Sequence, residues 1–148
     1  MFKKIVVGLD GSETSENALR IASDLASKYS SELHLVHTPQ PQTVAFAMGA
    51  MPGYHAVTTM PSEIEVQVAA EKILDLGTAI VVDMKHTVTA AHVGHGDPAD
   101  NIVKYAKETG ADLIVTGRRG LGAIGALVMG STSQRISHHA ECACLTIT

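Results

Sequence analysis

The stretch Gly117–Ser131, GRRGLGAIGALVMGS, decides how the rest of the chain is interpreted. Five of its fifteen residues are glycine, and two adjacent arginines, Arg118 and Arg119, lie among them. It follows the apolar run Leu113–Val115, which is typical of a buried strand, and it leads into a short segment of helical character. Glycine lets backbone N–H groups approach a ligand closely, and a following helix adds its positive end. The stretch therefore predicts a phosphate site between a strand and a helix.

The same stretch admits three other interpretations. It can be a flexible connector that binds nothing. Gly125 and Gly130 have the Walker A spacing, but Ser131 stands at the lysine position, which excludes that motif. Gly120–Gly125 fits the dinucleotide fingerprint G-x-G-x-x-G, yet only 23 residues follow it, too few for the acidic residue and the further βα units that it requires. We interpret this match as a consequence of glycine density.

Length and composition limit the class of protein. A chain of 148 residues with 45% apolar and 18% charged residues predicts one folded globular domain, residues 1–148. A net charge of −4 and scarce aromatic residues argue against nucleic-acid binding. No disulfide framework is expected from two cysteines. Neither a signal peptide nor a run of about 18 apolar residues is present, so we expect a cytoplasmic protein that is not embedded in a membrane.

Strands and helices alternate along the chain. Apolar runs predict strands at 5–9, 33–38, 87–93, 112–116 and 144–147. Helical spacing predicts helices from Ser12 to about residue 29, from Ser62 to about Asp83, from Asp97 to near Gly110, and from Ser131 to about His139. This alternation predicts an α/β fold, a single-domain doubly wound parallel five-stranded sheet with right-handed crossovers.

Residues 39–61 do not fit either period. Proline and glycine interrupt them, and the wider segment from Leu33 to Ser62 contains no Asp, Glu, Lys or Arg. Uncharged loops of this length are uncommon. We expect an irregular loop that serves as a lid or as a contact surface, with Met48, Met51 and Met60 supplying adaptable apolar contacts.

The ligand position follows from the expected sheet. In such sheets ligands bind beyond the carboxyl ends of the strands, where the strand order reverses. If strands one and four are neighbours there, Asp10 and Gly117 emerge side by side. A carboxylate can take ribose hydroxyls or help to hold a phosphate-bound Mg²⁺, while glycine amides take phosphates. The alternative for Asp10 is a turn-forming role at the end of a strand.

These residues resemble a known family. The pattern Gly117-x2-Gly120-x9-Gly130-Ser131 is similar to the ATP-binding signature of the universal stress protein family. The resemblance covers nearly the whole chain except about residues 39–61, and it includes KKIVVGLDGSETSENAL at 3–19, Gly96–Pro98, the segment 110–115, and His139–Cys142. Two departures are Gly8, where many relatives carry Pro or another residue, and Cys142–Cys144, where Cys-Pro-Val is usual.

The resemblance implies a flavodoxin-like or Rossmann-like sheet, of the adenine nucleotide alpha hydrolase type, with strand order 3-2-1-4-5. It also implies ATP with Mg²⁺ at the end of strand one, and a homodimer or a tetramer paired through the last strand. Asp10, following Gly8 and Leu9, would contact the ribose, and Thr38 would lie against adenine through its backbone. The residues expected to hold phosphates are Gly117, Gly120, Gly130, Ser131 and Thr132. From their charge alone, Arg118 and Arg119 are further candidates.

The function expected from this resemblance is regulatory. An ATP-binding sensor module would tune a partner protein, such as an enzyme or a transporter, according to its nucleotide state. One alternative is a weak ATPase or a self-phosphorylating enzyme, and a third is a flavin or dinucleotide carrier. No nucleophile–base–orienter set is found, so we assign no catalytic residue and expect at most slow hydrolysis. Ser12 and Ser131 are interpreted as helix caps.

Histidine and cysteine residues raise a metal hypothesis. His138, His139, Cys142 and Cys144 form the densest cluster, but its spacing fits known zinc sites poorly. A buried cysteine pair on one face of a strand is the simpler interpretation. His92 and His95 could act as acid–base groups, but we expect them two strands away from the ligand, as solvated loop residues.

Overall fold

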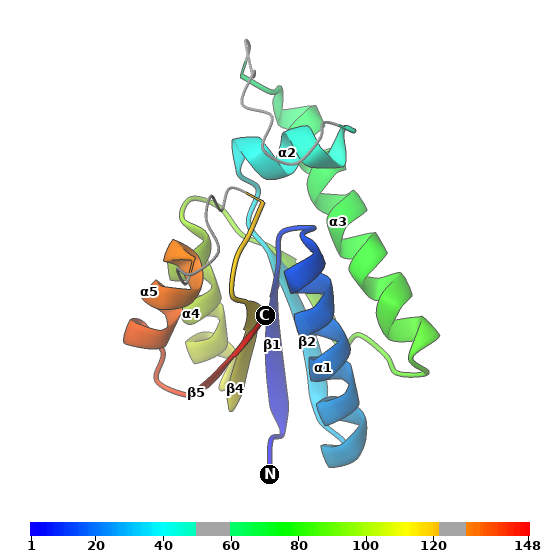
Figure 1. Cartoon of the computed structure of the whole chain (residues 1–148), viewed down its shortest axis with the longest axis vertical. Helices are drawn as coiled ribbons and strands as arrows, with labels where there is room; N and C mark the ends of the chain where they lie inside the picture. Colours follow the sequence, from blue (N-terminus) through cyan, green and yellow to red (C-terminus); the bar gives the residue numbers. More distant parts are fainter. Residues whose placement is uncertain (50–59, 122–129) are drawn as a thin grey trace.

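A five-stranded parallel sheet forms the centre of the computed structural model, which describes residues 1–49, 60–121 and 130–148 (Figure 1). The strand order is β3-β2-β1-β4-β5, and all four neighbouring pairs are parallel. The strands are β1 (Lys4–Leu9), β2 (Glu32–His37), β3 (Ala90–Val93), β4 (Leu113–Gly117) and β5 (Ala143–Ile147). The predicted α/β fold and strand order 3-2-1-4-5 are confirmed.

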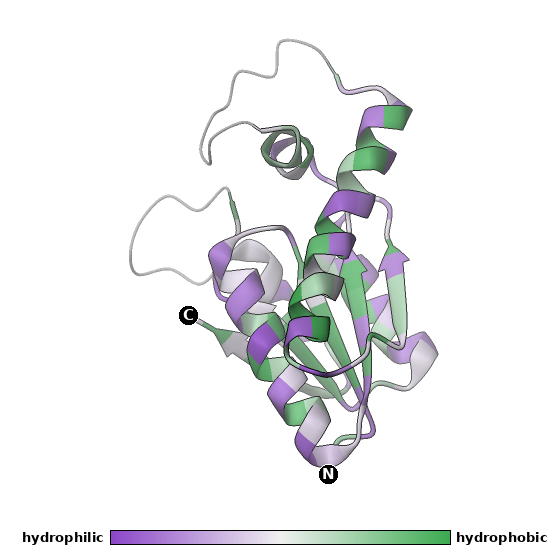
Figure 2. Ribbon diagram, turned by 90° about the vertical axis from the view of Figure 1, so that its right-hand side faces the viewer, coloured by the Kyte–Doolittle hydropathy of each residue, from purple (hydrophilic) through white to green (hydrophobic). Residues whose placement is uncertain are grey.

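The described helices cover both faces of the sheet. They are α1 (Glu13–Tyr29), α2 (Pro41–Ala47), α3 (Glu63–Asp83), α4 (Pro98–Thr109) and α5 (Ser131–His139). Alternate residues of β1 point to opposite faces, because side chains alternate along a strand. Val7 and its face pack against α1 and α3, whereas Val6 and its face pack against α4 and α5. Figure 2 shows the hydrophobic residues concentrated on the strands and on the helix surfaces turned toward them.

Polar caps fix where the longer helices begin. The Ser12 side chain accepts a hydrogen bond from the N–H of Ser15, and Ser62 forms a capping box with Glu65. Asp97 accepts from two N–H groups at the start of α4. Each cap satisfies donors that have no partner inside the helix, so the predicted starting positions agree with the structure.

Residues 39–61 are not irregular throughout, and the prediction was wrong for α2. Pro41 occupies a first-turn position, and the Gln40 N–H donates to the Thr43 hydroxyl at 2.8 Å. The seven-residue helix is held by tertiary contacts, because Val44 and Ala47 are buried and Lys72 Nζ of α3 donates to the Ala47 carbonyl at 2.8 Å. Residues 50–59, including Met51, lie outside the described residues, so the lid or contact role stays a prediction.

The start of one strand differs from the sequence-based expectation, whereas the helix predicted from Ser62 to about Asp83 is confirmed across its glycine. β3 begins at Ala90 rather than at residue 87 and has four residues at the edge of the sheet. Gly77, which weakens the helical pattern, lies inside α3, where a side-chain carbon would approach Leu9 Cδ1 to 2.7 Å. The glycine thus allows α3 to pack closely on β1.

In the part of the chain that the structure describes, no helix combines the length and apolar character needed to cross a membrane.

Candidate functional site

A cavity of about 340 Å³ lies at the carboxyl ends of β1, β2 and β4. Its position matches the place where ligands bind in open α/β sheets, since β2 and β4 flank β1 there. Every residue predicted for the site lines this cavity, namely Gly8, Leu9, Asp10, Thr38, Gly117, Arg118, Arg119, Gly120, Gly130, Ser131 and Thr132. The structure therefore brings together residues that are up to 124 positions apart in the sequence, from Gly8 to Thr132.

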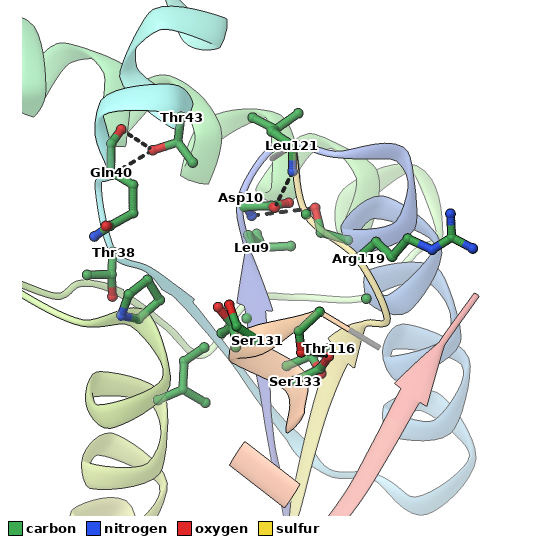
Figure 3. Close-up of a pocket in the computed structure, with 18 of the residues that line it drawn as sticks. Leu9, Asp10, Thr38, Gln40, Thr43, Thr116, Arg119, Leu121, Ser131 and Ser133 are labelled. Carbon is green, nitrogen blue, oxygen red and sulfur yellow. Dashed lines mark hydrogen bonds between the residues drawn. The ribbon is translucent and has the colours of Figure 1, made fainter. Parts of the chain in front are cut away.

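Asp10 is fixed at the end of β1 by the turn that follows it. One carboxylate oxygen accepts hydrogen bonds from the N–H of Ser12 at 2.9 Å and from the Ser12 hydroxyl at 2.5 Å. The other accepts from the N–H of Leu121 at 3.2 Å (Figure 3). The Asp10 carboxylate therefore both forms an Asx-type turn with Ser12 and contacts the glycine-rich stretch. A carboxylate has about four acceptor positions, which leaves capacity for a ligand.

Gly120 lies directly against Asp10. A side-chain carbon at Gly120 would be 2.3 Å from Asp10 Oδ2, a distance that two such atoms cannot share. The Thr14 hydroxyl donates to the Arg119 carbonyl, which holds the same segment against the first turn of α1. Residue 120 must therefore be glycine, because its backbone lies too close to the Asp10 carboxylate to leave room for a side chain. Residues 122–129, including the rest of the G-x-G-x-x-G match, lie outside the described part of the chain.

The start of α5 forms another wall of the cavity. Gly130 donates its N–H to the Arg118 carbonyl at 2.7 Å, and the Ser133 hydroxyl donates to the same carbonyl at 3.2 Å. The first N–H groups of a helix have no partner within it, and they form the positive end of its dipole. Because Ser131 and Thr132 begin this nine-residue helix and line the cavity, they provide an anion-binding geometry.

Two buried polar atoms on residues that line the cavity lack a hydrogen-bond partner in the described part of the chain. They are the hydroxyl oxygen of Thr38, whose residue is 4% exposed, and Nε of Arg118. Leaving such a group unsatisfied costs free energy, and buried polar atoms are paired in most proteins. A guanidinium donor and a hydroxyl that both lack partners fit a polar, anionic ligand.

Sequence reasoning missed several lining residues. They are Ser15, Val36, Gln40, Gln42, Thr43, Pro98, Ile102, Thr116, Leu121 and Ser133. Gln40 and Thr43 were hidden in the segment expected to be irregular, and Figure 3 shows them with Thr38 on the side of the cavity away from Arg119. Val36 and Ile102 carry only the apolar pattern of a core, which does not reveal that a cavity adjoins them. The signal that could have located Ser133 is its place one turn after Gly130.

His37, which lies next to Thr38 at the end of β2, is 1% exposed. Its Nδ1 is 2.7 Å from the Leu9 carbonyl oxygen, so this nitrogen carries the proton and donates. Burial lowers the pKa of the imidazole, against smaller raising effects from the Leu9 carbonyl and the Asp10 charge. The ring is therefore a neutral structural link between β1 and β2, close below the site.

The other histidines and the cysteines lie apart from the cavity. His92 stacks on Tyr105 with ring centroids 4.7 Å apart, and His95 is exposed. The predicted buried cysteine pair is wrong, because Cys142 is partly buried and Cys144 is exposed on the edge strand β5. Within residues 1–49, 60–121 and 130–148, no three His, Cys, Asp or Glu side chains form a potential metal site.

Comparison with known proteins gives consistent matches over the full length. The sequence model of the universal stress protein family matches residues 1–148. Universal stress protein YxiE of Bacillus subtilis is 32% identical over 152 residues, which cover 99% of each chain. A universal stress protein from Archaeoglobus fulgidus, solved in complex with dAMP, is similar with a TM-score of 0.70 and 22% identity, over 99% of this chain and 98% of that one. A universal stress protein in complex with cAMP gives a TM-score of 0.72 and 21% identity, over 99% and 97%.

Proposed function

The chain belongs to the universal stress protein family, and from this premise we propose that it is an ATP-binding sensor module whose cavity at the carboxyl edge of the sheet holds the nucleotide. The observation that carries the proposal is the cavity itself. It joins a carboxylate, a helix N-terminus, an arginine and a buried hydroxyl around one space of about 340 Å³. This set matches the chemically distinct parts of a nucleotide.

Each part of the nucleotide has a proposed partner. Phosphates lie at the start of α5, where Ser131 and Thr132 offer backbone N–H groups and hydroxyls, and Arg118 adds a charged donor. The ribose lies near Asp10. The base lies beside Thr38, on the side of the cavity that α2 closes.

Magnesium fits the same arrangement as a companion of the phosphates. Mg²⁺ prefers oxygen ligands and usually takes one or two carboxylates together with phosphate oxygens. Asp10 is the carboxylate that would complete such a site. When bound, the ion neutralises phosphate charge that Arg118 and the helix end leave uncompensated.

The choice of an adenine nucleotide is supported by relatives of this fold. Two structurally similar universal stress proteins were solved with cAMP and with dAMP, which share an adenine base.

The proposed regulatory role is supported by α2. This helix lines the cavity through Thr43, and the chain continues from it to surface residues such as Met48, which is 56% exposed. A partner that prefers the ATP-bound form must tighten ATP binding by the same factor.

Dimerisation through β5 is part of the proposal. The Ala143 N–H donates to the Asp112 carbonyl, and the Ile147 carbonyl accepts from Arg118. Because successive residues of a strand direct their backbone groups to opposite sides, the N–H groups of Cys144 and Thr146 point away from β4. This edge offers donors and acceptors to a second β5.

The experiment that tests nucleotide binding uses the purified protein. Heat denaturation should release ATP or ADP at about one per chain, and MgATP at 100 times its Kd should raise stability by about 2.7 kcal/mol. Asp10→Asn should weaken MgATP binding, because it removes the charge proposed to face ribose and Mg²⁺. Asp24→Asn, which makes the same chemical change at an exposed position of α1, is the matched control. No melting shift at millimolar MgATP would contradict the proposal.

A further inference from the structure

A second cavity, of about 250 Å³, lies on the face of the sheet that α1 and α3 cover. Its walls come from β1, α1, α2 and α3, and its surface is mainly apolar. The first cavity and this one share only Leu9 and Ser15 among their described lining residues, so they lie on the two sides of the end of β1. None of the roles proposed for the nucleotide uses this second space.

The cavity forms because α3 packs closely against β1 and α1 at Gly77, whereas α2 covers the cavity from the other side. Gly77 brings α3 against Leu9 and Leu19 at the floor of the cavity. Farther along, α3 extends beyond the carboxyl edge of the sheet beside α2 (Figure 1). Phe46 of α2 lines the cavity from that side, whereas Leu76, which directly precedes Gly77 in α3, lines it near the floor and remains 55% exposed. An apolar occupant would cover this side chain as well as the inner wall.

The lining specifies the chemistry of the occupant. Leucine, isoleucine and phenylalanine side chains dominate, and a dry cavity of about 150 Å³ with such walls accepts benzene. Two charged residues, Lys72 and Glu16, complete the lining. The Lys72 ammonium is held at the roof by its 2.8 Å hydrogen bond to the Ala47 carbonyl, and two of its three N–H donors remain for other acceptors. Among the residues that the structure describes, no donor forms a hydrogen bond to the Glu16 carboxylate.

We propose that this second cavity is a binding site for a small amphipathic carboxylate, a medium-length alkyl or aryl acid, with its apolar body between Leu19, Phe46 and Leu76 and its carboxylate on Lys72. The apolar walls supply most of the affinity through burial, and the fixed ammonium selects an anion over an amine or an alcohol. The site is independent of the nucleotide, and its test needs none.

The test compares octanoate, octanol and octylammonium at low millimolar concentration with the full chain, by NMR of isoleucine and leucine methyl groups. Octanoate should shift the methyl signals of Leu19, Ile73 and Ile80, which line the cavity. Octylammonium should bind more weakly than octanoate. Stronger binding of the amine, or octanoate shifts spread evenly over the molecule, would overturn the proposal.

Two variants with matched controls locate the ligand. Leu76→Ser should raise the Kd of octanoate about five-fold or more, because it removes buried apolar contact. Val82→Ser changes an equally exposed residue of α3, at 60%, that does not line the cavity, and it should leave the Kd unchanged. Lys72→Met should weaken octanoate but not octanol, whereas Lys104→Met on α4 should affect neither. Equal effects of Leu76→Ser and Val82→Ser, or unchanged octanoate binding in Lys72→Met, would contradict the assignment.

Discussion

At the scale of single residues, His37 shows how an interruption of a sequence pattern becomes a structural link. Its place in an apolar strand gives no hint of a role, yet the buried ring spans β1 and β2 through the Leu9 carbonyl. The neighbouring residue Thr38 lines the proposed nucleotide cavity. A change in the charge of His37 therefore acts directly beneath that cavity.

The lowered pKa of His37 predicts a loss of stability in acid. In the unfolded chain the imidazole takes a proton near its ordinary pKa of about 6.5, whereas in the folded chain burial lowers the pKa below that value. Between the two values the unfolded state binds more protons. The free energy of unfolding therefore falls as the pH drops from about 6.5 through the folded pKa, by at most about 1.4 kcal/mol per pH unit for this group.

Urea unfolding of the wild type and of His37→Gln between about pH 5 and pH 8 checks this expectation. The variant keeps an N–H donor for the Leu9 carbonyl but does not titrate, so its stability should depend less on pH below about 6.5. At pH 8 the ring is neutral in both states, so the difference there contains packing and hydrogen bonding but no contribution from titration of the ring. His34, whose pKa burial also lowers, contributes in the same direction, so His34→Gln/His37→Gln should flatten the profile further. An unchanged acid slope in both variants would contradict the assignment.

At the scale of secondary-structure elements, Arg135 joins two helix N-termini that border the candidate nucleotide cavity. Its guanidinium contacts Asp97 at 2.6 Å and Asp100 at 2.7 Å, which connects α5 to the start of α4. Asp97 uses its other oxygen to cap α4, so one carboxylate serves both helices. These two ion pairs of Arg135 thus hold the N-terminal part of α5, where we place the phosphates, against α4.

We expect Arg135→Gln to act on the phosphate end of the ligand more than on stability. The partners are exposed, so the loss in unfolding free energy should stay below about 1 kcal/mol. ATP affinity should fall about two- to five-fold, because the N–H groups of α5 lose part of their fixed position. Adenosine, which has no phosphate, should bind as before in calorimetric titrations. Lys104→Gln, whose ion pair with Glu108 lies within α4, is the control. Equal losses for ATP and adenosine would show that Arg135 does not position the phosphates.

At the scale of the whole molecule, the edge of β5 is the surface through which we propose that the chain dimerises. Thr146 directs its backbone N–H away from β4, and proline is tolerated only at such an edge position of a sheet. Thr146→Pro should therefore keep the monomer folded while it removes a donor that a second β5 would use. Sedimentation equilibrium should show a dimer for the wild type and a monomer for this variant. Thr146→Val keeps the donor and should remain dimeric. A dimer that persists in Thr146→Pro would place the interface elsewhere.

The sequence by itself determined the alternation of strands and helices, because apolar periodicity records which face of each element is buried. It also placed Asp10 and the glycine-rich stretch at one edge of the sheet, since the carboxyl ends of parallel strands meet there. Capping side chains such as Ser12 and Asp97 gave the helix starts for the same local reason. The elements and caps depend on residues that are close in the sequence, and the meeting of Asp10 with the glycine-rich stretch follows once those elements form a parallel sheet.

Only the tertiary structure decided which elements meet across the chain. α2 forms because Val44 and Ala47 are buried and Lys72 bonds to its last turn, contacts that no local pattern contains. Cys144 is exposed because no strand lies beyond β5 in the described fold. The second cavity exists because Gly77 draws α3 onto β1 while α2 stays above it. Cavities and short helices depend on how distant side chains pack, and sequence periodicity does not encode those distances.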